Sequence, residues 1–117
     1  MDYSKYQIVK KGQFVMNHMD LLTGFVDISK YDGVTSPDYR VFQKIHWEVN
    51  NSYYLWIFQL CYWNKIFYGL GQGVSNLGRW RLPSDVFNDF ILPSPPLTEQ
   101  EEIVKYLDQQ TKEIDNL

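Results

Sequence analysis

The chain has 117 residues, 44% hydrophobic and 21% charged, which is typical of one small folded domain and excludes a disordered tail. Its formal net charge of −3 excludes a protein coated in positive charge, such as a histone-like DNA binder. The acidic side chains are concentrated at the end, since residues 98–117 contain 6 acidic and 2 basic residues, against 8 and 9 in residues 1–97. The nearly neutral body leaves contact with nucleic acid open.

The first 45 residues predict a β-rich segment. Residues 6–9 (YQIV) and 13–17 (QFVMN) have the β-branched and aromatic content of short strands, with a turn at residues 10–12 between them. Residues 24–29 (GFVDIS) alternate apolar and polar side chains, the period of a half-buried strand. A turn at residues 31–33 then precedes extended chain at residues 39–42 and 44–45.

Aromatic residues make up 17% of the chain and are densest between Trp47 and Tyr68. Residues 53–62 have the length and apolar density of a helix buried on most sides, with Asn51 or Ser52 as its N-cap. Exposed aromatics could instead stack on bases, but such a surface needs interleaved basic residues, and only Lys65 intervenes. We therefore expect most of these rings to fill a core.

Residues 69–81 contain four of the seven glycines and predict a flexible loop. The loop lacks the Gly-Lys-Ser/Thr ending of a phosphate-binding P-loop. Its polar side chains suit hydrogen bonds to base edges or phosphates, although an ordinary polar surface loop explains them equally well. The candidate DNA-contacting residues of this loop are Gln72, Ser75, Asn76, Arg79 and Arg81.

The last 20 residues predict a helix. Three prolines prevent a helix before Leu97, and Thr98 with Glu101 fits a capping box at its start. Apolar residues then recur at the spacing of a coiled-coil seam, with one polar member, so this helix is expected to pack along another helix. The seam consists of Ile103, Leu107, Gln110, Ile114 and Leu117.

Catalytic chemistry is not supported by the sequence. His18 and His46 have no Cys or carboxylate set at metal-ligand spacing, and the single Cys61 excludes both a disulfide framework and a multi-cysteine zinc site. No signal peptide precedes the first strand, and the longest apolar run, residues 53–63, is about half of the roughly 20 residues that span a membrane. We expect a cytoplasmic, non-enzymatic protein with no metal, no cofactor and no membrane segment.

Residues 90–100 (FILPSPPLTEQ) and the helix seam after them resemble the end of a target recognition domain in specificity subunits of type I restriction-modification systems. Residues 6–17 (YQIVKKGQFVMN) and 31–39 (YDGVTSPDY) resemble the second half of such a domain. The resemblance implies an α+β fold. Residues 1–97 would form a partial target recognition domain with a buried aromatic helix, and residues 98–117 the start of a conserved spacer helix of coiled-coil type.

The family's function is sequence-specific recognition of double-stranded DNA without catalysis. Methyltransferase and restriction subunits carry the chemistry, using S-adenosylmethionine, magnesium and ATP. The family's opening segment is missing before Met1, so we expect a truncated or remnant form that self-associates. Lys10, Lys11 and Arg40 are further candidates for contacts to the DNA backbone. The alternative function is protein–protein association alone, with methyltransferase or other specificity chains.

Overall fold

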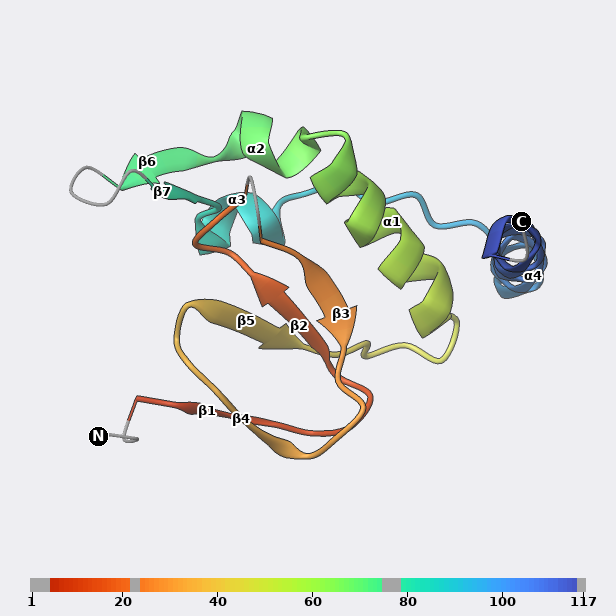
Figure 1. Ribbon diagram of the computed structural model, residues 1–117, viewed down its shortest axis with the longest axis horizontal. Coiled ribbons are helices and arrows are strands. Elements are labelled where there is room, and N and C mark those ends of the chain that lie inside the picture. The colour runs from red at the N-terminus through yellow and green to blue at the C-terminus, as the bar shows by residue number, and fades with distance from the viewer. Residues whose placement is uncertain (1–4, 22–23, 75–78, 116–117) are drawn as a thin grey trace.

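Strands come first along the chain and helices follow, with one late β-hairpin between them (Figure 1). The computed structural model describes residues 5–21, 24–74 and 79–115. This arrangement confirms the predicted α+β fold class. In chain order the elements are β1 (Gln7–Val9), β2 (Phe14–Asn17), β3 (Val26–Ile28), β4 (Gly33–Thr35), β5 (Tyr39–Phe42), α1 (Asn51–Trp63), α2 (Ile66–Leu70), β6 (Gln72–Val74), β7 (Arg79–Arg81), α3 (Ser84–Asn88) and α4 (Leu97–Asp115).

The central sheet has the strand order β3-β2-β5 and is antiparallel throughout. Its register aligns Phe14 with Ile28 on one side and with Phe42 on the other. Gly12, with a φ of 93°, makes the turn into β2, a conformation that glycine adopts without steric cost. Residues 44–45, predicted as extended strand, lie outside the sheet in the connection from β5 to α1.

A second, two-stranded sheet pairs β1 with β4 below the central sheet (Figure 1). The chain bends at residues 30 and 31, but the turn predicted at residues 31–33 is only partly present, because Gly33 already belongs to β4, a strand that was not predicted. Its facing pair Ile8 and Val34 is 70% and 62% exposed, so this sheet buries little on that face. Strand β4 lacks the run of alternating apolar residues by which short strands are recognised.

The core lies between the central sheet and α1. Rings from β2, β5 and α1 meet there: Phe14 stacks on Phe42 at 5.1 Å between centroids, and Phe58 stands edge-on to both at 5.6 and 5.4 Å. Edge-on and stacked ring pairs each add about 1 kcal/mol beyond the burial of apolar area. The expected aromatic core is thus confirmed for this part of α1, whereas Trp47 and Trp63 are 77% and 55% exposed.

Helix α1 begins one residue earlier than expected. Asn50 is its N-cap, and the Asn50 side chain accepts a hydrogen bond from the backbone N–H of Tyr53 at 3.0 Å. The prediction of Asn51 or Ser52 as the cap is therefore wrong, because both residues already lie inside the helix. All three side chains suit an N-cap, so local sequence did not distinguish them.

The described parts of the glycine-rich segment contain a short helix and two paired strands, where the sequence predicted a loop. Residues 66–70 form α2, and β6 and β7 then pair antiparallel with Gln72 opposite Arg81 and Val74 opposite Arg79. The hairpin extends away from α1 and the central sheet (Figure 1). Ser75 and Asn76, two of its candidate contact residues, lie outside the described residues.

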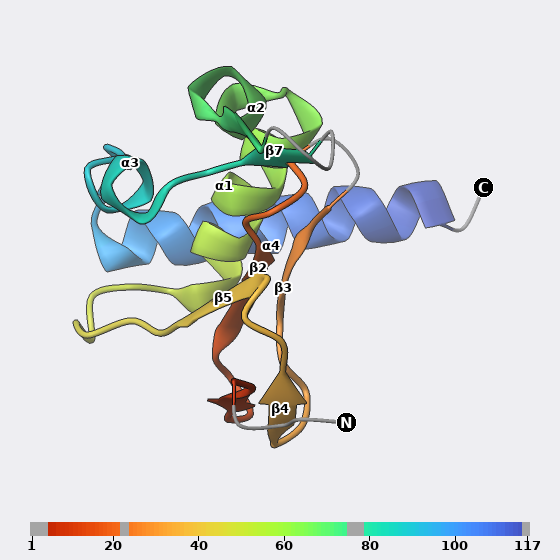
Figure 2. The same ribbon diagram turned by 90° about the vertical axis from the view of Figure 1, so that its left-hand side faces the viewer.

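Helix α4 follows a stretch without regular structure that contains the three prolines, as predicted. It begins at Leu97, so Thr98 is already helical and the expected capping box, which needs Thr98 in front of the first turn, is not formed. Its first half packs behind α1, and its second half runs past the rest of the molecule (Figure 2).

Candidate nucleic-acid interface

The base of the β6–β7 hairpin is tied to the central sheet. The backbone N–H of Leu82, directly after β7, donates to the carbonyl of His18 at 2.9 Å, directly after β2. Leu82 is itself buried in the core. The hairpin therefore starts from a fixed point at one end of β2, which places Arg81 beside the central sheet.

Arg40, predicted as a contact to the DNA backbone, is engaged inside the protein. Its Nη2 donates to the Ser84 hydroxyl at 3.0 Å and to the Leu82 carbonyl at 3.4 Å, and its guanidinium lies 4.5 Å from the centre of the Phe87 ring. Nη1 is buried and has no hydrogen-bond partner among the described residues. Burial lowers the pKa of Arg40; the neighbouring Tyr62 raises it and the charge of Arg81 lowers it. Arg40 thus joins β5 to the segment after β7.

His18 lies beside Arg40, which the sequence did not reveal. Its Nε2 is 3.0 Å from the carbonyl of Pro37, and its Nδ1 is 3.4 Å from Nη2 of Arg40. A guanidinium only donates hydrogen bonds, so Nδ1 acts as the acceptor and Nε2 carries the proton. The strand pairing that aligns Met16 with Arg40 brings the two together, and no local sequence signal reports it.

A cavity of about 240 Å³ opens at this point. Its lining combines a histidine, an arginine and a hydroxyl with one carboxylate, so it is polar and has both signs of charge. The lining residues are His18, Arg81, Leu82, Pro83, Ser84 and Asp85. Arg81 is exposed, and its positive charge also lowers the pKa of His18. This cavity brings one predicted residue, Arg81, together with two that were not predicted, His18 and Ser84.

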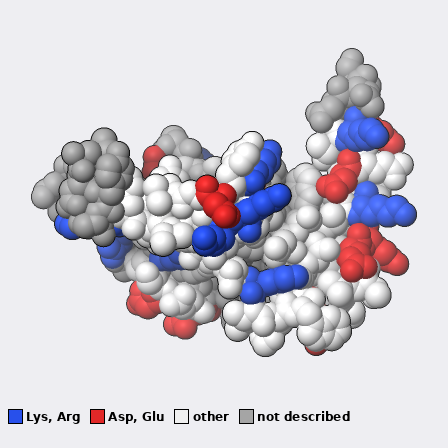
Figure 3. Space-filling model, turned by 90° about the horizontal axis from the view of Figure 1, so that it is seen from below, with Lys and Arg blue, Asp and Glu red and all other residues white. Residues whose placement is uncertain are grey.

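Lys10 and Lys11 lie elsewhere, at the exposed turn between β1 and β2. The backbone N–H of Lys11 donates to a carboxylate oxygen of Asp32 at 2.8 Å, which holds this turn against the one before β4. The four residues of β2 separate the two lysines from the hairpin base, roughly 13 Å of extended chain. Seen from below, Lys and Arg side chains lie near the middle of the molecule with acidic side chains among them, and both signs of charge also occur along α4 (Figure 3).

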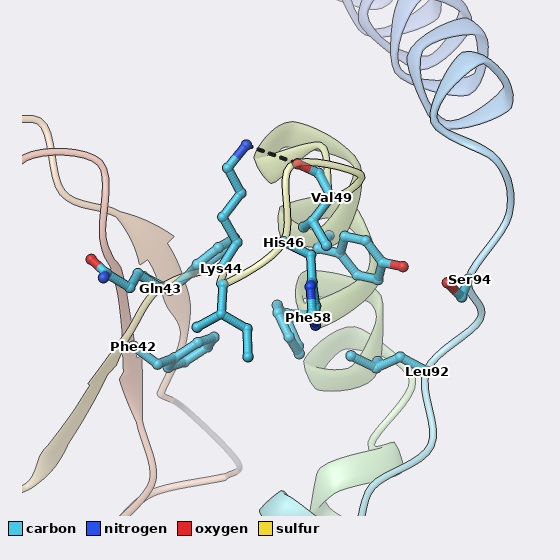
Figure 4. A pocket seen from close by; sticks show the side chains of 11 residues that line it. Phe42, Gln43, Lys44, His46, Val49, Phe58, Leu92 and Ser94 are labelled. Carbon is cyan, nitrogen blue, oxygen red and sulfur yellow. Dashed lines mark hydrogen bonds between the residues drawn. The ribbon is translucent and has the colours of Figure 1, made fainter.

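A cavity with largely apolar walls lies on another side of the molecule, between β5, α1 and the chain before α4 (Figure 4). It measures about 360 Å³, and Phe42, Phe58 and Leu92 form its walls. Lys44 stands at its edge with Nζ donating to the carbonyl of Val49 at 3.0 Å. The apolar walls offer few partners for a phosphate or a base edge, so the nucleic-acid candidates remain those at the hairpin and at the β1–β2 turn.

The predicted seam of α4 divides into two parts. Ile103 packs against the core and Leu107 is half-buried, whereas Gln110 is exposed and Ile114 is 67% exposed. Leu117 lies outside the described residues. The first half of the seam is therefore covered by this chain, and the exposed second half leaves the coiled-coil prediction to be tested with a partner.

In residues 5–21, 24–74 and 79–115 no group of three or more His, Cys, Asp or Glu is placed to hold a metal ion. Cys61 is buried in α1, and burial raises the pKa of its thiol, which keeps it protonated and unreactive. None of the helices in this described part is long and apolar enough to cross a membrane.

Comparison with known proteins agrees with the resemblance that the sequence suggested. The family described as the type I restriction modification DNA specificity domain matches residues 1–117. No curated protein matches the chain. Because the family match covers all the residues of the sequence, the protein belongs to the family of type I restriction modification DNA specificity domains.

Proposed function

We propose that the chain recognises a specific sequence in duplex DNA as part of the specificity subunit of a type I restriction-modification system, in the cytoplasm. It would do so without catalysis of its own, while methyltransferase and restriction subunits carry out the chemistry. The observation that carries the proposal is the family match over residues 1–117. The structure adds a protruding hairpin with arginines in its second strand.

The β6–β7 hairpin suits DNA by its shape and its residue types. A two-stranded β-ribbon fits the major groove of B-form DNA, where arginine pairs with guanine and glutamine with adenine. Arg79 and Arg81 occupy alternate positions of β7, and Gln72 lies opposite Arg81 in the register. Lys10 and Lys11, at the far end of β2, would hold phosphates on a neighbouring part of the duplex.

The experiment compares a hairpin variant with a charge-matched variant on α4. Duplex binding is measured by fluorescence anisotropy across a salt series for the wild type, for R79A/R81A and for K105A/K112A. Each lost phosphate contact reduces the slope of log affinity against log salt by about one, and a lost base contact costs about 1–3 kcal/mol. We expect R79A/R81A to bind weakly and K105A/K112A to bind as the wild type does. Equal affinities for all three would contradict the hairpin as the contact surface.

A second function, association with other subunits through α4, is favoured by the exposed end of this helix. Ile114 of the seam is 67% exposed on a helix whose first half is packed, and Tyr106, beside the seam, is 62% exposed. An exposed apolar seam on a helix is the feature by which helices pair. The substitution I114K should weaken co-purification with the methyltransferase subunit, with a second specificity chain, or with both, and leave DNA affinity unchanged. Unchanged co-purification would rule out the exposed end of α4 as the surface that binds other subunits.

A further inference from the structure

The cavity at the hairpin base brings together polar side chains that can bind an anion. His18, Arg81 and Ser84 face a common space of about 240 Å³, and Arg40 lies against both His18 and Ser84. We propose that this cavity binds one phosphodiester group of the DNA backbone, with Arg81 and Ser84 in contact with its oxygens and His18 taking up a proton as the phosphate binds. The proposal rests on the proposed DNA-recognition function and assigns it a defined site.

The first argument is that two arginines lie together at the cavity, where their charges act on each other and on His18. Arg40 and Arg81 lie close enough to interact, because the charge of Arg81 lowers the pKa of Arg40. Both arginines also lower the pKa of His18. An anion in the cavity would be attracted by Arg81, which lines it, and by the charge of Arg40 behind His18 and Ser84. Arginine forks also match the geometry of phosphate oxygens.

The second argument is the unused hydrogen-bonding capacity of Ser84. Its Oγ accepts a bond from Arg40 at 3.0 Å, and a hydroxyl that accepts one bond still has its own proton to donate. The side chain is exposed and lines the cavity, so this proton is available to a phosphate oxygen. Arg40 itself acts as a positioning residue, because it fixes the Ser84 oxygen and the hairpin base.

The third argument concerns the proton on His18. In the free protein Nδ1 accepts from Arg40 and Nε2–H donates to Pro37, so the neutral ring is fully bonded. Burial is the main cause that lowers the pKa of His18 below 6.5, and the two arginines add to it. A bound phosphate brings negative charge to the same space, which favours the protonated ring. The added proton goes to Nδ1, so the 3.4 Å bond from Arg40 is given up, while Nη2 of Arg40 keeps its bonds to Ser84 and Leu82. By linkage, a group that gains a proton on binding makes affinity rise as pH falls.

Two carboxylates oppose the anion and must be included. Asp38, just before β5, raises the pKa of His18, and Asp85 of α3 lines the cavity. The charged groups that face His18 are thus Asp38, Arg40 of β5, Arg81 of β7 and Asp85. Since Asp85 borders the site, the substitution D85N removes a repulsive charge and should strengthen binding of duplex DNA.

The test measures the affinity of the full chain for a pool of random-sequence fluorescent duplexes at low salt, from about pH 5.5 to 8, around the ordinary pKa of histidine. The wild type should bind more tightly at lower pH, by at most about tenfold per pH unit for uptake of one proton. H18Q should lose this dependence, and R81Q should reduce the salt slope by about one. H46Q is the matched control, because the chain has 2 histidines and His46 is exposed in another region.

The outcomes separate the site from the function. No duplex binding by the wild type at any pH would overturn the proposed function and the phosphate site with it. Duplex binding in which H18Q and R81Q both behave as the wild type would overturn the phosphate site and leave DNA recognition standing. Loss of the pH dependence of duplex binding in H46Q would also overturn the phosphate site, because it would assign the proton uptake to His46. Should H18Q fail to fold, the exposed Arg81 variant and the retained pH dependence of H46Q still decide the matter.

Discussion

Gln100 on the first turn of α4 is hydrogen-bonded to the segment that starts α1. Its Oε1 accepts the backbone N–H of Asn50 at 2.8 Å, and its Nε2 donates to the carbonyls of Glu48 and Pro95 at 3.0 and 2.8 Å. The side chain is 1% exposed, and both ends of its amide are used. One buried amide thereby fixes the direction in which α4 leaves the domain relative to α1.

We predict that Q100A lowers the free energy of unfolding by about 2–4 kcal/mol. The substitution removes three part-buried hydrogen bonds and leaves one N–H and two carbonyls without that partner, each at a cost of about 1 kcal/mol. Chemical denaturation of the variant measures the loss. Q109A is the matched control, because Gln109 is exposed on the same helix and its loss should change stability by less than about 0.5 kcal/mol. Equal effects would contradict a special role for Gln100.

A second prediction tests where α1 begins. N50A removes the side-chain oxygen that accepts the Tyr53 N–H and should destabilise the domain by about 1 kcal/mol. S52A, at an exposed position inside the helix, should have little effect. Thermal unfolding followed by circular dichroism distinguishes the two. A larger loss for S52A than for N50A would mean that Ser52 caps the helix, two residues later than the structure has it.

The third prediction separates a structural arginine from a DNA-contacting one. R40A removes the bonds to Leu82 and Ser84 and the cation–π contact with Phe87, and should cost about 2 kcal/mol of stability. R81A, at an exposed position, should leave stability unchanged and weaken duplex binding. Unfolding curves and anisotropy titrations on the same preparations provide both values. A destabilised R81A with a stable R40A would reverse the two assignments.

The fourth prediction concerns pH. The pKa of His18 in the folded protein is below its ordinary value of 6.5, chiefly because of burial. The unfolded chain therefore takes up a proton first as pH falls through 6.5, and His18 contributes stability that is present above this pH and lost below it. As pH is lowered from about 8 to 5, the free energy of unfolding should fall less steeply for H18Q than for the wild type. The curve of H46Q should keep the wild-type steepness, and a steepness shared by all three would show that His18 plays no part.

The parts of the fold that sequence predicted correctly depend on neighbouring residues. The apolar density of α1 and the prolines before α4 act within a few residues, so both helices were found. The β6–β7 hairpin was mistaken for a loop, because two strands of three residues, one with a glycine at its centre, lack a clear alternation. Pairing with a neighbouring strand, and not local propensity, makes such short segments extended.

The candidate site was only partly predictable for the same reason. Arg40 was proposed as a DNA contact for its charge. Its partners inside the protein, Leu82, Ser84 and Phe87, could not be foreseen because they are more than 40 residues away in sequence. His18 had no visible partner until β2 and β5 were paired. Arg81 is the predicted residue that the structure places both at the surface and beside a polar cavity.

The central claim is sequence-specific recognition of DNA, and the measurement that tests it most directly is a ratio of affinities. A duplex enriched from a random pool by the chain, bound to its methyltransferase subunit, is compared with a scrambled duplex of the same composition. The account predicts that the enriched duplex binds at least about a thousandfold more tightly at physiological salt, as specific sites do. Equal affinities for the enriched and the scrambled duplex would contradict it.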